Sequence, residues 1–155
     1  MNGIGLTLRA LHRGECRLAA DLLAAADRHR ADHEVRHVAT DLAHWSREHA
    51  RRLTEAGAGP EPAAHEDTRT ACPGPDPEEG HRGLSLLRDL RALHLAAVDN
   101  SLHWEMLAQA ARATRDEALL VLASECHPRT LRQMRWTNTV IKNIAPQVLA
   151  VSPAR

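Results

Sequence analysis

The segment from residue 57 to residue 83 constrains the fold more than any other part of the chain. It holds five of the eight prolines and has neither helical nor strand periodicity, so it predicts a long linker. On each side of it lie two stretches whose apolar residues recur at the three-and-four spacing of an amphipathic helix. The expected helices are residues 4–29, 32–56, 84–113 and 115–144.

Two short turns and one long linker predict a single all-α domain, a four-helix bundle made of two antiparallel helical hairpins. A helix of about 26 residues is about 39 Å long, and an extended linker of this length can run back along it. The connectivity is therefore ferritin-like, because an up-down-up-down bundle needs only a short second loop. Pro128 lies inside the fourth stretch and predicts a kink or break near His127.

Composition narrows the classes of function. The 20 basic residues balance the 20 acidic ones, which argues against a broad positive surface for nucleic acid or an anionic membrane. No apolar run approaches the roughly 20 residues needed to span a bilayer, and the N-terminus lacks a signal-peptide pattern. Three scattered cysteines are too few for a disulfide framework. We therefore expect a cytoplasmic protein.

The apolar stripes of the first two helices are each interrupted by one ionisable residue. Glu15 interrupts the first stripe after Leu11, and His49 interrupts the second after Trp45, where a leucine would be expected. Many of the eleven histidines are instead expected on polar helix faces or in the linker. This group comprises His12, His29, His33, His65, His81 and His103.

Several short motifs are distributed over both predicted hairpins. They are Gly14-Glu15, the run DLAHWSREH at residues 41–49, CHPRT at 126–130, then Gln133, Trp136, Lys142 and APQ at 145–147. Together they resemble a group of small bacterial ferritin-like proteins that is functionally uncharacterised. The wider ferritin-like superfamily implies a di-iron site, with one Glu from each of two helices and a Glu-x-x-His from each of the other two.

Carried over onto this chain, the di-iron pattern is incomplete. Glu15 matches the glutamate of the first helix, but the fourth helix fails because Glu125 is followed three residues later by Pro128. The other candidate ligands are Glu34-x-x-His37 and Asp41-x-x-His44 in the second helix, and Asp99 or Glu105 in the third. A hemerythrin-like site matches only one ligand pair, His44-x-x-x-Glu48, because the third helix has no His-x-x-x-His.

Helix geometry selects among the candidates of the first hairpin. With the turn centred near residue 31 or 32, residues of the two helices are level when their numbers sum to about 63. Glu15 is then level with His49, whereas Glu34 and His37 lie far from it. Glu34-x-x-His37, which matches the di-iron motif most closely, is therefore too far along the second helix to share a site with Glu15.

The same rule applies to the second hairpin. With the turn near Thr114, level residues have numbers that sum to about 228. Cys126 and His127 are then level with Ser101, and the crossover brings them close to the level of Glu15. A second layer, nearer the first turn, is expected to hold His94, Gln133 and Asp41.

Two interpretations fit the first layer. In one, a single iron or zinc ion is bound in the bundle core and supports an oxidase or redox-sensing role. Its ligands would be Glu15, His49 and either Cys126 or His127. In the other, Glu15 and His49 form a buried hydrogen-bonded pair that fixes the register, and Cys126 is a small apolar side chain. The protein would then act without a cofactor, as a homo-oligomer or by binding a protein partner.

Overall fold

The described part of the chain, residues 2–59 and 79–150 of a computed structural model, is almost entirely helical. It contains four long α-helices, one turn of π-helix and no strand among the described residues. The elements are α1 (Gly3–Arg28), α2 (His33–Leu53), η1 (Thr54–Ala58), α3 (Glu79–Thr114) and α4 (Glu117–Leu149). The prediction of an all-α chain with four helices is confirmed, whereas the predicted course of the linker falls outside the described residues between 60 and 78.

Three of the helices begin at a side chain that accepts a hydrogen bond from the first turn. Asn2 accepts from the backbone N–H of Gly5, at 2.9 Å, and so starts α1. Asp32 and Asp116 cap α2 and α4 in the same way, each at 3.1 Å. Each cap satisfies a donor that has no partner inside its own helix.

Two helix boundaries differ from the prediction by five residues. α3 begins at Glu79 and not at residue 84, so the last part of the predicted linker is helical. Gly83 lies inside this extension, where a Cβ atom would come within 2.6 Å of a methyl of Val148. The same packing accounts for the longer α4, which reaches Leu149 where residue 144 was expected.

α4 is not broken at Pro128. A kink or break was expected near His127, and the helix runs through both Pro128 and Pro146 without a break. A proline inside a helix costs about 3 kcal/mol in lost hydrogen bonding and crowding. Since α3 and α4 form the most extensive contact between helices in the described part of the chain, we infer that their packing outweighs this cost.

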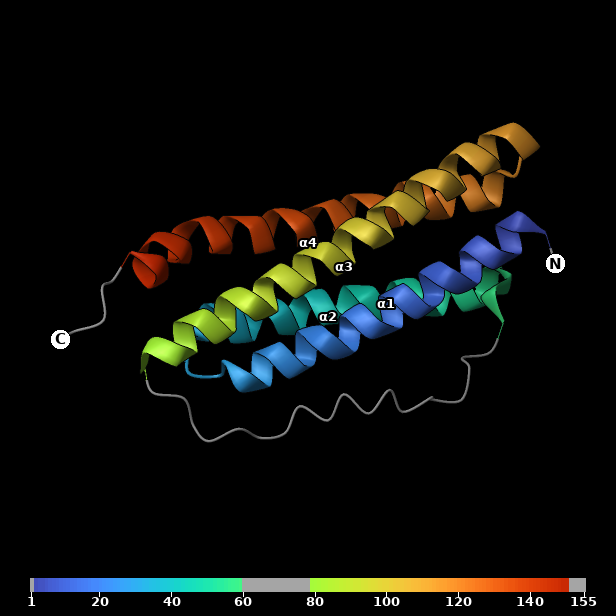
Figure 1. The fold of residues 1–155 in the computed structure, drawn as a ribbon. Helices are drawn as coiled ribbons and strands as arrows, with labels where there is room; N and C mark the ends of the chain where they lie inside the picture. The colour runs from blue at the N-terminus through green and yellow to red at the C-terminus, as the bar shows by residue number, and fades with distance from the viewer. Residues whose placement is uncertain (1, 60–78, 151–155) are drawn as a thin grey trace.

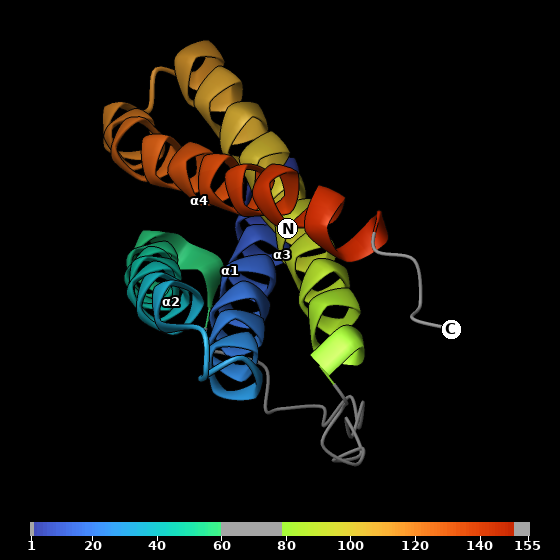
Figure 2. The same cartoon turned by 90° about the vertical axis from the view of Figure 1, so that its left-hand side faces the viewer.

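The helices form a bundle in which α1 lies between α2 and α3, while α4 packs on α3 and touches α2. Figures 1 and 2 show the four helices from the side and from one end. In Figure 1, η1 lies at the end of the bundle opposite to the start of α3. Gly57, inside η1, has a φ of 108° that suits glycine and ends the helical course begun by α2. Within the described residues, no helix is both long enough and apolar enough to cross a membrane.

A group of buried polar side chains divides the apolar core. On every helix these residues fall between one cluster that includes Leu11, Leu53 and Cys126 and a second that includes Leu18 and Leu42. We call the group the polar layer. Its members are Glu15 on α1, Ser46 and His49 on α2, Asn100 on α3, and Thr130 and Gln133 on α4.

The buried face of α3 is only partly the one that its apolar spacing predicts. That spacing puts Leu90, Ala97 and Trp104 on the core face, and all three are buried. It also puts Leu87, His94 and Ser101 there, but these residues are only half-buried. The residues just before them are buried instead, as part of a stripe that also includes Leu90 and Leu107. These neighbours are Leu86, Leu93 and Asn100. The reason is that α3 packs against both α1 and α4, so two sides of it are apolar.

Candidate functional site

Glu15 is the centre of the polar layer. Its side chain is fully buried in α1, and its Oε1 lies 3.2 Å from His49 Nδ1 and 3.0 Å from Trp104 Nε1. Because an ionised carboxylate only accepts hydrogen bonds, both rings donate to it. One oxygen of Glu15 therefore connects α1 to α2 and to α3.

The bond to Glu15 also fixes the tautomer of His49. With its hydrogen on Nδ1, the neutral imidazole carries its lone pair on Nε2. The His49 ring stands edge-on to the Trp104 indole, with the ring centroids 5.7 Å apart. His49 is 1% exposed, so this lone pair is held inside the bundle.

Several polar atoms of the layer have no hydrogen-bond partner in the described part of the chain. The two nearest the centre are Glu15 Oε2 and His49 Nε2, which are both acceptors. Asn100 Nδ2, Thr130 Oγ1 and Gln133 Oε1 share this condition. A buried polar atom without a partner costs about 1–3 kcal/mol, so each calls for a water molecule, an ion or another explanation.

The remaining members of the layer hold it in place. Gln133 Nε2 donates to the backbone oxygen of Leu42 at 3.0 Å and to Ser46 Oγ at 2.9 Å, which ties α4 to α2. Asn100 lies against Gly14, where a Cβ atom would come within 2.2 Å of the Asn100 Oδ1. Gly14 thus allows α1 and α3 to approach closely at this level.

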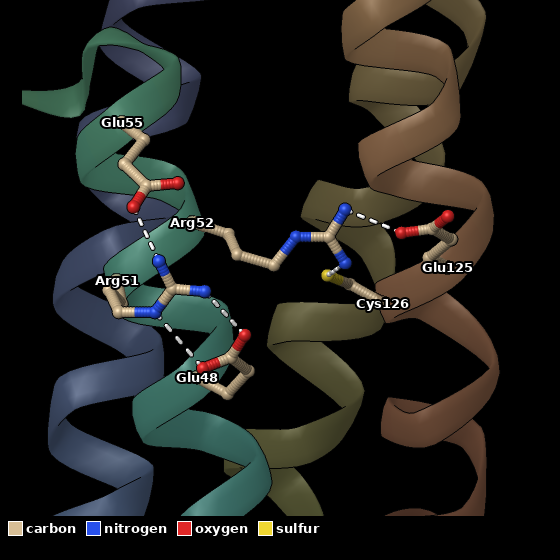
Figure 3. A network of polar contacts seen from close by, with 6 residues as sticks. All are labelled: Glu48, Arg51, Arg52, Glu55, Glu125 and Cys126. Atoms are coloured by element: carbon tan, nitrogen blue, oxygen red, sulfur yellow. Dashed lines mark hydrogen bonds and ion pairs between the residues drawn. The ribbon is translucent and has the colours of Figure 1, made fainter.

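Cys126 lies beside the polar layer in the apolar cluster of the core. Its thiol is buried and contacts Arg52 Nη1 at 3.7 Å, while Arg52 Nη2 binds Glu125 at 2.5 Å (Figure 3). Burial raises the pKa of the Cys126 thiol to about 11; the Arg52 charge lowers this pKa and the Glu15 carboxylate raises it further. Cys126 is therefore a neutral thiol near pH 7 and must lose a proton before it can bind a metal.

Figure 3 also shows a surface network on α2 beside this contact. Arg51 reaches Glu48 on one side and Glu55 on the other. The hydrogen bonds from Arg51 lower the pKa of Glu48 below its ordinary value. The three side chains are 43–64% exposed, so the network lies on the surface of α2, separate from the polar layer.

His127 lies in a different place from the other predicted ligands. Its Nε2 is 2.8 Å from Ser101 Oγ, and its Nδ1 is 3.8 Å from Glu105 Oε2. The side chain lines a pocket of about 160 Å³ between α3 and α4, next to Pro128. The predicted level of His127 with Ser101 is observed, but both ring nitrogens face partners outside the polar layer.

The other candidates from the di-iron pattern are on the surface. Their side chains are exposed, and this group comprises Glu34, His37, Asp41, His44, Asp99 and Glu105. The expected second layer is observed only in part: Gln133 is buried, but Asp41 is exposed and His94 bonds to Thr137 at 2.8 Å. Among the described residues, no group of three or more His, Cys, Asp or Glu side chains is arranged to hold a metal ion.

Two histidines expected on polar faces are largely buried. His12 is 5% exposed and lies 3.1 Å from Thr54 Oγ1. The His29 side chain is 9% exposed and lies 2.6 Å from Asp89 Oδ2. In each case a polar side chain on another element replaces the hydrogen bond to water that the buried imidazole loses.

A comparison of the chain with protein-family models, with curated proteins and with solved structures gives no match.

Proposed function

We propose that the protein is a ferritin-like helical bundle that binds a single transition-metal ion, iron or zinc, in its polar layer. In this proposal His49 Nε2 binds the ion, and Glu15 holds and orients the His49 ring from Nδ1. The observation that carries it is the pair of buried acceptors left without partners on two side chains that are bonded to each other. A cation on His49 Nε2 satisfies this buried lone pair, while Glu15 Oε1 holds the ring from its other nitrogen.

The proposed ferritin-like connectivity consists of two antiparallel hairpins joined by a crossover. Contacts of α1 with α2 and η1 support it. Glu15 contacts His49, and His12, which precedes Glu15, contacts Thr54, which follows His49, as antiparallel segments require. Contacts between α3 and α4 follow the same rule. There His94 meets Thr137, and the later Ser101 meets the earlier His127.

The donor set suits a metal ion of intermediate softness. Zinc and iron both accept imidazole nitrogen and carboxylate oxygen. A histidine that gives its other N–H to a carboxylate is held in the tautomer that metals bind, and Glu15 Oε1 supplies that second contact to His49. Gln133 Oε1 and Thr130 Oγ1 are further buried oxygens without partners in the described chain.

The proposed stoichiometry is one ion per chain. A second ion in a ferritin-like bundle needs a Glu-x-x-His on the fourth helix, and α4 has none. A bound iron ion would supply one-electron chemistry, which corresponds to an oxidase or redox-sensing role. The chain itself would hold the ion, orient His49 through Glu15 and keep bulk water away.

Metal analysis of the full chain, purified without chelator, tests the proposal. We expect about one iron or zinc per chain in the wild type and an affinity about 10–100-fold lower in Glu15→Gln, which keeps the shape of the side chain. Glu34→Gln, an exposed residue on α2, is the matched control and should keep the metal. A folded wild type that retains no metal and shows no spectral change on titration with Co²⁺ would refute the proposal.

A second candidate function, self-association, is favoured by an apolar stripe on the surface of α3. Four exposed apolar residues spaced eleven, seven and four apart fall within about 40° of one another around the helix. They are Leu84, Leu95, Leu102 and Met106.

The stripe fits a second copy of the chain. Arg91 and Glu105, both exposed, lie seven residues before and after Val98 on the same flank of α3. Antiparallel pairing of two α3 helices about a twofold axis near Val98 would place each arginine against the partner's glutamate. Sedimentation of the wild type as a dimer and of Leu102→Glu as a monomer would support this, with Leu131→Glu on α4 as the control. A monomeric wild type would exclude it.

A further inference from the structure

A pocket of about 540 Å³ opens on the outer face of α1 and α2, separate from the polar layer. Its wall includes His12 and Cys16 from α1, Arg47 and Arg51 from α2, and Thr54 from η1. The pocket thus brings a thiol, an imidazole, a hydroxyl and two guanidinium groups to one place.

The hydroxyl of Thr54 orients the imidazole of His12. Thr54 Oγ1 donates to the backbone oxygen of Ala50 at 3.1 Å and lies 3.1 Å from His12 Nε2. Because a hydroxyl has only one hydrogen, Thr54 accepts from His12 Nε2–H. The neutral His12 ring therefore carries its lone pair on Nδ1.

Cys16 lies one helical turn after His12 on the same side of α1. Its Sγ is 4.0 Å from His12 Nδ1 and 3.8 Å from Nε2, and the residue is half-buried at the pocket wall. A nucleophile, a base and a group that orients the base are the parts of an activated cysteine site. The same parts are not assembled at Cys126, which is buried against Arg52.

The positive charge of the pocket selects the ligand. Arg51 is occupied by Glu48 and Glu55, but Arg47 stands outside that network and lines the pocket with an exposed side chain. A cation at the mouth of a cysteine site favours small reactants that carry carboxylates.

We propose that Cys16 is a reactive thiol that undergoes exchange with small anionic disulfides of the glutathione type. His12 Nδ1 takes the thiol proton, and the Cys16 thiolate attacks one sulfur of the disulfide. The disulfide bond breaks while a new S–S bond forms to Cys16. The other half leaves as a thiolate and receives the proton from His12, so Cys16 is oxidised and one molecule of small thiol is released. This site is independent of the proposed metal function.

Intact-protein mass spectrometry with oxidised glutathione tests the proposal. The reaction is followed in a Cys72→Ser background, because Cys72 lies outside the described residues. We expect one glutathionyl adduct on Cys16 in the wild type. In His12→Gln this adduct should form at least about tenfold more slowly. Thr54→Val, which keeps the side-chain shape, should slow it as well, and His33→Gln, an exposed histidine, should not.

A cationic disulfide separates the chemistry of the site from its ligand preference. Cystamine should react more slowly than oxidised glutathione, and Arg47→Glu should reverse this order. Equal adduct rates in the wild type and in a folded His12→Gln would show that His12 does not activate Cys16. Equal rates for the two disulfides in the wild type would overturn the choice of an anionic reactant.

Discussion

Trp104 donates its indole N–H to the same oxygen of Glu15 that His49 contacts, at 3.0 Å. Through these two bonds one carboxylate of α1 fixes the level of both α2 and α3. Trp104 is 0% exposed, so its large ring also fills the core beside the polar layer. The contact therefore sets the register of the bundle whether or not a metal is bound.

Replacing His49 should be the most damaging change to any histidine of the described chain. His49→Ala leaves a cavity and removes one of the two donors to buried Glu15, with a combined cost of about 3–5 kcal/mol. His33→Ala, at an exposed position, should cost less than about 0.5 kcal/mol. Equal melting temperatures of the two variants would contradict this assignment.

Gly14→Ala should destabilise the protein, by about 1–3 kcal/mol. The new methyl would meet Asn100 Oδ1 at 2.2 Å, so Asn100 or the α1–α3 contact must move. Gly3→Ala is the control, because a Cβ atom there meets nothing within 4 Å and alanine favours the helix. Thermal unfolding should show opposite signs for the two changes, and a neutral Gly14→Ala would mean that the helices are not held this closely.

The sequence predicted those parts of the structure that depend on periodicity. The four helices follow from apolar spacing, and counting residues from the first turn placed Glu15 level with His49, which are in contact. The same counting placed His127 level with Ser101. Height along a helix can be counted because the rise per residue is constant.

Rotation about the helix axis could not be predicted in the same way. His127 is at the expected level but faces Ser101 and Glu105, and Asn100 is buried where its neighbour Ser101 was expected. The three-and-four spacing of α3 fits two adjacent faces, and only packing against both α1 and α4 decides between them. The sequence indicates the burial of Asn100 only indirectly, through the Gly14-Glu15 pair on α1, because Asn100 lies against Gly14.

Asp89 should make stability depend on acid pH. It lies 2.6 Å from His29 Nε2 and 3.0 Å from Arg28 Nε. Burial raises the pKa of Asp89, but the hydrogen bonds from His29 and Arg28 outweigh this and lower it below its ordinary value. A lowered pKa means that the carboxylate stabilises the fold above about pH 4 and that this contribution is lost as the pH falls below that value.

The measurement is chemical denaturation at a series of pH values. The wild type should lose stability between about pH 4 and pH 2, and Asp89→Asn should be less stable than the wild type at pH 7 but flatter across that range. Asp99→Asn is a suitable control, because Asp99 is exposed on the same helix. Parallel pH curves for the wild type and Asp89→Asn would show that the carboxylate does not contribute.

Cys126 should be nearly inert towards alkylation at neutral pH. Only the thiolate reacts, and burial raises the pKa of this thiol to about 11. In a Cys16→Ser, Cys72→Ser background, the iodoacetamide rate of the folded protein should therefore climb about tenfold per pH unit from pH 8 to pH 10. The same chain unfolded in urea should react faster and level off above about pH 9. If the folded protein reacts as fast as the unfolded one at pH 7, the thiol is exposed, and Cys126 belongs neither to the core nor to the neighbourhood of the polar layer.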